Sequence, residues 1–253
     1  MRYILMLGIF CFSLPHPSHA SDAYVALGQW QYSESAPHIQ GFTATPMQSR
    51  ASGQAIQLGL KHQWTSPELG YMRAHIQGIR SLAPAQEHWQ LNTQQQSNAL
   101  QIQEANIQGE LGITQDHLDM GLLISYQWHQ QSRQHFISNG IPIIVQGEPV
   151  LETVQNIWLG LNLRYSAPTW GAEASWEIPT WVHTSNSMVQ GIFTTTAGFR
   201  IHTALNYPIA NSPWGIHIAY DRREQGGELL AQQWLWPKNR WQMLSLRLSF
   251  AWS

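Results

Sequence analysis

The feature that most constrains this chain is a period-two alternation of apolar and polar side chains, which recurs in ten segments. This spacing is typical of β-strands that have one apolar face. In 56–64, for example, Ile56, Leu58 and Leu60 are separated by polar residues or glycine, whereas in 24–33 the apolar face is ambiguous. The chain is therefore predicted to be all-β. The ten segments are 24–33, 56–64, 72–77, 104–113, 120–128, 157–165, 170–178, 193–207, 214–220 and 244–252.

The connections between these segments alternate in length. Short connections contain turn-forming residues, as in Ser66-Pro67 and Ala167-Pro168, and cover 66–70, 114–118, 166–169 and 208–213. Long polar connections cover 34–52, 83–98, 130–153, 179–191 and 222–240. This alternation predicts an up-and-down antiparallel barrel of about 10 strands, within a range of 8–12, that has short turns at one end and long loops at the other.

Aromatic residues stand at the ends of several apolar rows. Amphipathic rings favour the interface between lipid and water, so this position predicts the aromatic girdle of a transmembrane barrel. The rows are also close to the ~9–11 residues that a tilted strand needs to cross a bilayer. The predicted girdle consists of Trp64, Trp128, Tyr165, Trp170, Tyr207, Trp214 and Tyr220.

Composition separates a membrane barrel from two soluble alternatives. Charged residues make up only 11% of the chain, compared with ~25% in an ordinary soluble domain. A soluble β-sandwich would show a charged face to water, and a lipocalin-like barrel would bury its aromatic residues inside. No run of 18 apolar residues follows the N-terminal segment, so no transmembrane helix is predicted. The formal charge of −2 argues against nucleic acid as a partner.

The first twenty residues have the pattern of a secretory signal peptide. Arg2 provides a positive start, 4–14 is a short apolar stretch, and Ser18 and Ala20 are small residues at the −3 and −1 positions. We therefore predict a signal peptide over 1–20 and a single barrel domain over 21–253. Cys11 is the only cysteine and lies inside this segment after Phe10, so the mature chain would have no thiol.

The C-terminal row resembles the assembly signal of bacterial outer-membrane barrels, a class whose chains usually end on an aromatic residue. Here Trp252 is penultimate, and Ser253 follows. The resemblance covers the whole mature chain at the level of this class. It implies location in the outer membrane of Gram-negative bacteria, contact with membrane lipids and recognition by the insertion machinery. The predicted signal contains Leu246, Leu248, Phe250 and Trp252.

The polar faces of the strands would line the lumen with balanced charge. Lys61, His75, Asp119, His217 and Asp221 belong to this inward set. Ten strands enclose a lumen that side chains can fill, so mutual ion pairs that close it are the first interpretation, and a pore of one dominant sign is the alternative. The candidate lumen cluster is Arg73, Glu104, Glu110, Arg164, Glu173, Glu177, Arg200, His202 and Arg247.

Catalysis has weaker support than a closed lumen. Glu173 or Glu177 would act as a general base beside His202 if the lumen cluster were catalytic. Omptin-type proteases also have ten strands, but the match is in strand number only, because no Asp-Asp or Asp-His dipeptide is present. Lipid-modifying barrels use a Ser/His pair on the lipid-facing wall, where His62 lies among apolar neighbours. We assign no catalytic residue, metal site or cofactor.

The leading prediction is an outer-membrane barrel with a narrow, charge-balanced lumen and a non-enzymatic structural or recognition role. Its extracellular loops carry an apolar run over 141–145, together with Trp234 and Trp236. This run is either a loop strand that extends the barrel above the membrane or a contact surface for lipopolysaccharide, a partner protein or an apolar solute. The alternatives are a narrow channel for small solutes and a membrane-embedded hydrolase of the omptin-like or lipid-modifying kind.

Overall fold

The structure is a computed structural model of the chain, and it describes residues 18–36, 47–66, 70–91, 94–187, 198–226, 229–230, 234–235 and 238–252. The apolar segment 4–14, Trp236 and the first part of the predicted strand 193–207 lie outside these residues. Within them, no helix is long and apolar enough to cross a membrane.

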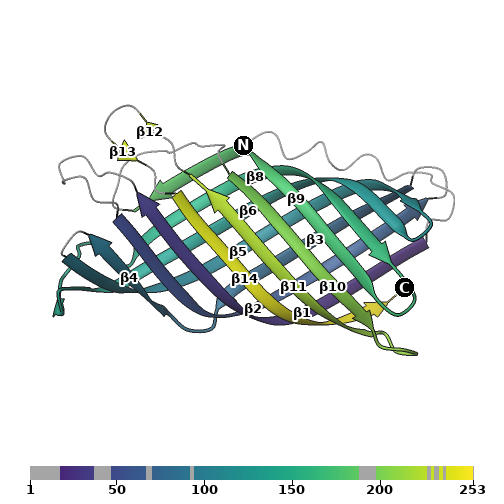
Figure 1. Cartoon of the computed structure of the whole chain (residues 1–253), viewed down its shortest axis with the longest axis horizontal. Helices are drawn as coiled ribbons and strands as arrows, with labels where there is room; N and C mark the ends of the chain where they lie inside the picture. The colour runs from purple at the N-terminus through teal and green to yellow at the C-terminus, as the bar shows by residue number, and fades with distance from the viewer. Residues whose placement is uncertain are drawn as a thin grey trace.

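Ten antiparallel strands close into a ring, as predicted (Figure 1). Three strands of two residues each are not part of this ring: β7 (Ile141–Pro142), β12 (Leu229–Leu230) and β13 (Trp234–Leu235). The ring itself contains β1 (Ser18–Ala36), β2 (Met47–Ser66), β3 (Gly70–Ser81) continued by β4 (Ala85–Leu91), β5 (Gln94–Gln115), β6 (Leu118–Ser138), β8 (Val150–Ser166), β9 (Gly171–Asn186), β10 (Gly198–Pro208), β11 (Trp214–Gln225) and β14 (Lys238–Trp252).

The first and last strands pair with each other and close the barrel. Ser21 of β1 lies opposite Trp252 of β14, and the pairing continues to Ser35 opposite Lys238. β3 and β4 form one interrupted strand, because both pair with β2 on one side and with β5 on the other. The interruption falls at 82–84, which includes Pro84, a residue that cannot donate a ladder hydrogen bond.

The strands are longer than a membrane crossing requires. β5 has 22 residues and β6 has 21, whereas a tilted strand needs ~9–11 to cross the bilayer. Much of the predicted loop sequence therefore continues the strands beyond the membrane. The segment 83–98, predicted as a loop, is mostly the β4–β5 hairpin. The described strands thus form an extracellular extension of the barrel wall, at the left in Figure 1.

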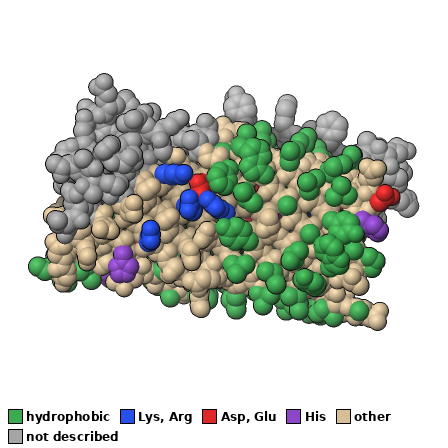
Figure 2. Space-filling model, in the orientation of Figure 1, with side chains coloured by type: hydrophobic (Ala, Val, Ile, Leu, Met, Phe, Trp, Pro, Cys, Tyr) green, Lys and Arg blue, Asp and Glu red, His purple; other side chains and the backbone are tan. Residues whose placement is uncertain are grey.

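The outward face carries a belt of exposed apolar side chains. Leu60, Leu122 and Leu246 are 55%, 67% and 59% exposed, and Figure 2 shows such side chains over the right-hand part of the molecule. Val25 and Leu27 belong to the belt, which resolves the ambiguous face of the first strand. A contiguous apolar belt of this kind is a lipid-facing surface. The fold and the belt together place the chain in the outer membrane.

Candidate functional site

The polar faces of the strands point into the barrel and are largely buried. Alternation along each strand determines this, because neighbours of lipid-facing residues must point to the lumen. Arg73, Glu110 and Glu177 are between 1% and 5% exposed. The structure places all nine residues of the candidate lumen cluster on this inner wall, namely Arg73, Glu104, Glu110, Arg164, Glu173, Glu177, Arg200, His202 and Arg247.

Arg73 organises the end of the lumen nearest the periplasm. Its guanidinium lies 2.7 Å from Glu110 Oε2 and 3.4 Å from Asp119 Oδ2. Its Nη2 also donates to Gln63 Oε1 at 2.8 Å, and the Tyr71 hydroxyl donates to Glu110. One cation therefore connects two carboxylates and is itself held by a neighbouring amide, an arrangement that fixes these side chains in place.

Two further ion pairs lie at the same end of the lumen as Arg73. Lys61 Nζ lies 3.7 Å from Glu173 Oε2, and Arg164 Nε lies 3.5 Å from Asp119 Oδ2. Arg164 and Glu173 face each other in the β8–β9 register, as a cross-strand cluster requires. The ion pairs that they form are nevertheless with other residues: Arg164 pairs with Asp119, and Glu173 pairs with Lys61.

The middle of the lumen contains a second group of ion pairs. Asp221 lies 2.8 Å from His202 Nδ1 and 3.3 Å from Arg247 Nη2. Arg200 lies 3.6 Å from Glu177, opposite it in the β9–β10 register. His202 therefore pairs with Asp221 and not with Glu173 or Glu177, the bases considered from the sequence. Five members of the candidate lumen cluster lie on the neighbouring strands β8, β9 and β10, and they are divided among separate ion pairs: Arg164, Glu173, Glu177, Arg200 and His202.

The lumen becomes apolar towards the outer half. Trp30, Trp158 and Trp241 point inward and are 1%, 0% and 4% exposed. Gly53 makes room for Trp30, because a Cβ there would meet the indole at 2.9 Å. Charged groups lie level with these tryptophans. Glu104 lies 3.0 Å from Arg223, which faces Trp241 in the β11–β14 register, and 3.2 Å from a nitrogen of the buried His129 ring.

A cluster of three glutamates around one arginine lies inside the extracellular extension. Arg133 lies 3.0 Å from Glu34, 2.8 Å from Glu87 and 3.4 Å from Glu152. Burial raises the pKa of Glu34 to about 7, and the neighbouring glutamates add to this while Arg133 opposes it. The pKa of Glu152 is raised as well, first by burial. We call these four residues the Arg133 cluster.

Little empty space remains beside the ion pairs. The cavity among them has a volume of only about 30 Å³ and is lined by residues that include Lys61, His75 and Arg200, which is room for one or two water molecules. Among the described residues, no three His, Cys, Asp or Glu side chains are grouped so as to hold a metal ion. The described lumen therefore holds charge in closed pairs and offers no wide passage.

The sequence interpretation missed the Arg133 cluster and the inward tryptophans. Glu34, Glu87, Arg133 and Glu152 fall in segments that were predicted as loops. A signal was present in 85–91, where Ala85, Glu87, Trp89 and Leu91 continue the alternation of the preceding strand. The outward residues of this segment, Gln86, His88 and Gln90, are polar, because the strand has passed beyond the lipid. The alternation of apolar and polar residues that predicts a membrane strand is therefore lost here.

The predicted girdle residues point outward at the two ends of the belt. Tyr165, Trp170, Tyr207 and Trp214 are 38–47% exposed and lie at the periplasmic end. Trp64 lies at that end too, half-buried, while Trp128 and Tyr220, also half-buried, lie at the outer end. The four residues of the predicted assembly signal also point outward, along β14: Leu246, Leu248, Phe250 and Trp252.

Cationic side chains gather on the outer wall just beyond the apolar belt (Figure 2). Glu224 is surrounded there by Arg222, by Arg240 with Nε at 2.8 Å, and by Lys238 with Nζ at 3.2 Å. Burial alone would raise the pKa of Glu224, but the hydrogen bonds and charges of these neighbours lower it. Three cations around one carboxylate leave an excess of positive charge.

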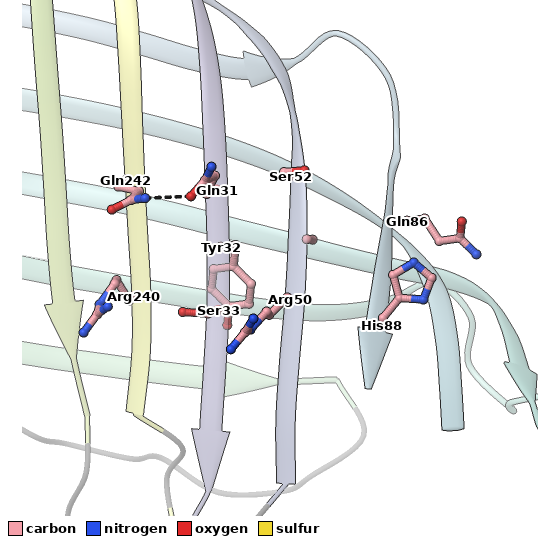
Figure 3. A pocket seen from close by; sticks show the side chains of 10 residues that line it. Gln31, Tyr32, Ser33, Arg50, Ser52, Gln86, His88, Arg240 and Gln242 are labelled. Atoms are coloured by element: carbon pink, nitrogen blue, oxygen red, sulfur yellow. Dashed lines mark hydrogen bonds between the residues drawn. The ribbon is translucent and has the colours of Figure 1, made fainter. Parts of the chain in front are cut away.

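An open groove of about 630 Å³ adjoins these cations. Figure 3 shows Gln31 and Ser33 of β1 between β14 and β2, with Arg240 on one side and Arg50 on the other. His88 of β4 lies beyond Arg50 and faces it in the register. The lining is polar and hydrogen-bonded, as in the 2.7 Å contact from Gln242 to Gln31. We call this the basic groove.

Comparisons with known proteins agree with the fold. No family model matches the chain, and no curated protein is similar to it in sequence. The crystal structure of the outer membrane protease OmpT from Escherichia coli is 10% identical, covers 94% of this chain and 97% of its own, and has a TM-score of 0.60. The transport unit of the autotransporter AIDA-I from Escherichia coli is 12% identical, covers 96% and 94%, and has a TM-score of 0.45. The likeness to OmpT shows that the chain has the fold of Gram-negative outer-membrane barrels.

Proposed function

We propose that this protein is a closed outer-membrane barrel that does not conduct and that acts at the cell surface through its extracellular extension. The observation that carries the first part is the filled lumen. Ion pairs around Arg73 and Asp221, the tryptophan layer and the Arg133 cluster follow one another along the lumen. Buried charges with partners on several strands cannot separate without a large desolvation cost, so this closure is stable.

Conductance of the refolded chain 21–253 in planar bilayers tests the closed lumen. We expect no steady openings from protein that shows a heat-modifiable gel shift and floats with liposomes. These two controls establish that the barrel has folded and inserted. Steady openings with ion selectivity would overturn the closed lumen and make a narrow solute channel the better interpretation.

The recognition role is supported by the basic groove. Gln31 and Ser52 continue the same outward faces as the lipid-facing Leu27 and Ile56, so the groove begins where the lipid belt ends. Arg50 and Arg240 are exposed within it. Their position and charge fit the phosphorylated sugar headgroups of the glycolipid in the outer leaflet, because guanidinium groups bind phosphate in a bidentate manner. The groove would therefore hold lipopolysaccharide headgroups.

Binding of lipopolysaccharide to the refolded barrel in detergent tests this role. We expect Arg50→Gln together with Arg240→Gln to weaken binding at least ~10-fold, since hydrogen bonds to charged groups contribute ~1.5–3 kcal/mol each. Arg80→Gln is the matched control, because Arg80 is an exposed outward cation of β3 that does not line the groove. Unchanged affinity in the double variant, or an equal loss in the control, would overturn the assignment.

A further inference from the structure

A serine, a histidine and an asparagine form a hydrogen-bonded chain at the periplasmic end of the lumen. Ser249 Oγ lies 2.6 Å from His217 Nε2, and His217 Nδ1 lies 2.5 Å from Asn206 Oδ1. The three residues come from the adjacent strands β14, β11 and β10. Asn206 and His217 are directly opposite in the register, and Ser249 is diagonal to His217, which lies opposite Arg247.

The order of these groups is that of an activated serine. An amide oxygen only accepts, so Asn206 Oδ1 requires the proton on Nδ1 and leaves Nε2 with a free lone pair. Nε2 then faces the Ser249 hydroxyl as an acceptor and a general base at 2.6 Å, which is closer than the Gly215 carbonyl oxygen, the other acceptor of this hydroxyl, at 3.4 Å. Nucleophile, base and orienting group thus follow one another within hydrogen-bond reach, the geometry by which triads are recognised whatever their fold.

Space for a substrate lies next to the reacting atoms. These residues line a cavity of about 340 Å³ that is open at the periplasmic end. Gly215 lies opposite Ser249, and a Cβ on Gly215 would stand 2.9 Å from Ser249 Oγ and 3.3 Å from His217 Nε2. The missing side chain leaves this position free. By contrast, the ion-paired cavity in the middle of the lumen has only about 30 Å³.

The lining indicates the class of substrate. The same cavity is lined by Lys61 and Arg164 from the lumen and by the girdle residues Trp170, Tyr207 and Trp214, which point outward. It therefore opens on the rim of the barrel, where the lumen meets the lipid interface marked by these aromatic residues. An amphiphile can reach this position with its polar part towards Ser249 and its apolar part towards the membrane.

We propose that Ser249, His217 and Asn206 form a serine hydrolase site for the acyl ester of an amphiphile that enters from the periplasmic leaflet. Ser249 Oγ bonds to the acyl carbon while His217 Nε2 takes the hydroxyl proton. The ester C–O bond then breaks, and His217 gives this proton to the leaving alcohol. A water oxygen, deprotonated by His217, then bonds to the acyl carbon, the bond from this carbon to Ser249 Oγ breaks to release the acid, and His217 returns the proton to Oγ. Asn206 is a positioning residue. This activity is independent of the proposed surface role and departs from the non-enzymatic prediction.

Labelling of the refolded chain with an alkyl fluorophosphonate tests the nucleophile. The probe forms a phosphonyl ester with an activated serine and releases fluoride, so mass spectrometry should find one adduct on Ser249. Ser249→Ala and Gly215→Ala should lose the adduct, the second because it fills the free position. Ser245→Ala is the matched control, since Ser245 is a buried inward serine of the same strand, and it should label as the parent does. All variants are compared as folded, heat-modifiable protein.

Further variants separate a catalytic arrangement from a merely structural hydrogen-bond chain. Asn206→Asp keeps the acceptor and should keep labelling, whereas Asn206→Leu and His217→Gln should slow it at least ~100-fold, the scale of general-base catalysis. Labelling that is unchanged in folded His217→Gln, or no adduct on Ser249 in the folded parent, would overturn the site.

The hydrolysis of two p-nitrophenyl esters tests the substrate class. We expect the palmitate ester, presented in detergent micelles, to be hydrolysed at least 10-fold faster than the soluble butyrate ester. Turnover of the butyrate alone would overturn the amphiphile assignment in favour of a soluble ester. If Ser249 is labelled by the probe but neither ester is hydrolysed, ester hydrolysis would be overturned as the activity.

Discussion

The phenol ring of Tyr24 occupies the space that a side chain at Gly59 would need. A Cβ at Gly59 would overlap the ring directly. The phenol oxygen is fixed there, because it donates to Gln77 Oε1 at 3.0 Å and lies 2.9 Å from His75 Nε2. Because these residues come from β1, β2 and β3, one small residue permits a polar contact across three strands. The absence of a side chain at Gly59 therefore allows Tyr24 to pack inside the lumen.

Replacement of Gly59 by Ala should destabilise the barrel by about 1–3 kcal/mol, the usual cost of forcing extra atoms into a packed interior. The measurement is the temperature at which the heat-modifiable form is lost. Gly78→Ala is the control on the neighbouring strand, because the nearest atom to a Cβ there is a backbone oxygen at 3.8 Å. Equal midpoints for the two variants would contradict the role given to Gly59.

Stability of the extracellular extension should fall as the pH rises from about 4.5 to about 7. The pKa of Glu34 is about 7 in the folded protein because the carboxyl is buried, while its ordinary value is 4.5. Between pH 4.5 and 7, the Glu34 carboxyl holds a proton in the folded state that it has released in the unfolded state. Raising the pH over this range therefore lowers the free energy of unfolding, by on the order of 3 kcal/mol at most. Proteolysis of the extension as a function of pH measures this effect.

Glu34→Gln should remove most of this pH dependence and protect the extension at pH 8. The amide keeps the shape of the protonated side chain and carries no charge. Gln48→Glu, which changes an exposed outward residue of β2, is a control for an added carboxylate on the same part of the wall. An extension that becomes more resistant to proteolysis as the pH rises would contradict the assignment.

Loss of the Arg133 guanidinium should be more damaging than loss of any one of its partners. Arg133→Met would leave three buried carboxylates without their cation, and the removal of one partner of a buried pair costs about 3–5 kcal/mol. Adding Glu87→Gln and Glu152→Gln should recover much of the loss, since the uncompensated charge is removed. Chemical denaturation of the barrel in detergent measures both steps, and a triple variant no more stable than Arg133→Met would contradict this account.

The sequence predicted the wall of the barrel better than its contents. Alternation tells which residues point inward, so Arg164 and Glu173 could be assigned to the lumen and even placed on facing strands. It does not give the shear of the barrel, and shear decides which residues meet across the lumen. Contacts such as Arg133 with Glu34, 99 positions apart, and Arg223 with Glu104, 119 apart, therefore had no local signal.

The serine–histidine–asparagine chain illustrates the same limit at shorter range. Asn206, His217 and Ser249 lie far apart in the sequence, and no motif spacing joins them. The register between β10, β11 and β14 brings them together. Alternation predicts that His217 points inward, but its partners can be predicted only when the pairing of the neighbouring strands is known.

Replacement of Phe250 and Trp252 by Ala should reduce the yield of inserted barrel in cells. Both side chains point outward on the last strand, and Trp214 contacts Phe250 edge-on at 5.0 Å between ring centroids. β14 also pairs with β1 to close the ring, so a weakened last strand would leave the barrel open during insertion. The yield of heat-modifiable protein in isolated outer membranes is the measurement.

Trp176→Ala and Trp181→Ala together remove two outward tryptophans of β9 and keep the last strand intact, so this pair should insert almost normally. Equal losses in the two double variants would show that outward aromatic residues in general, and not the terminal row, favour insertion.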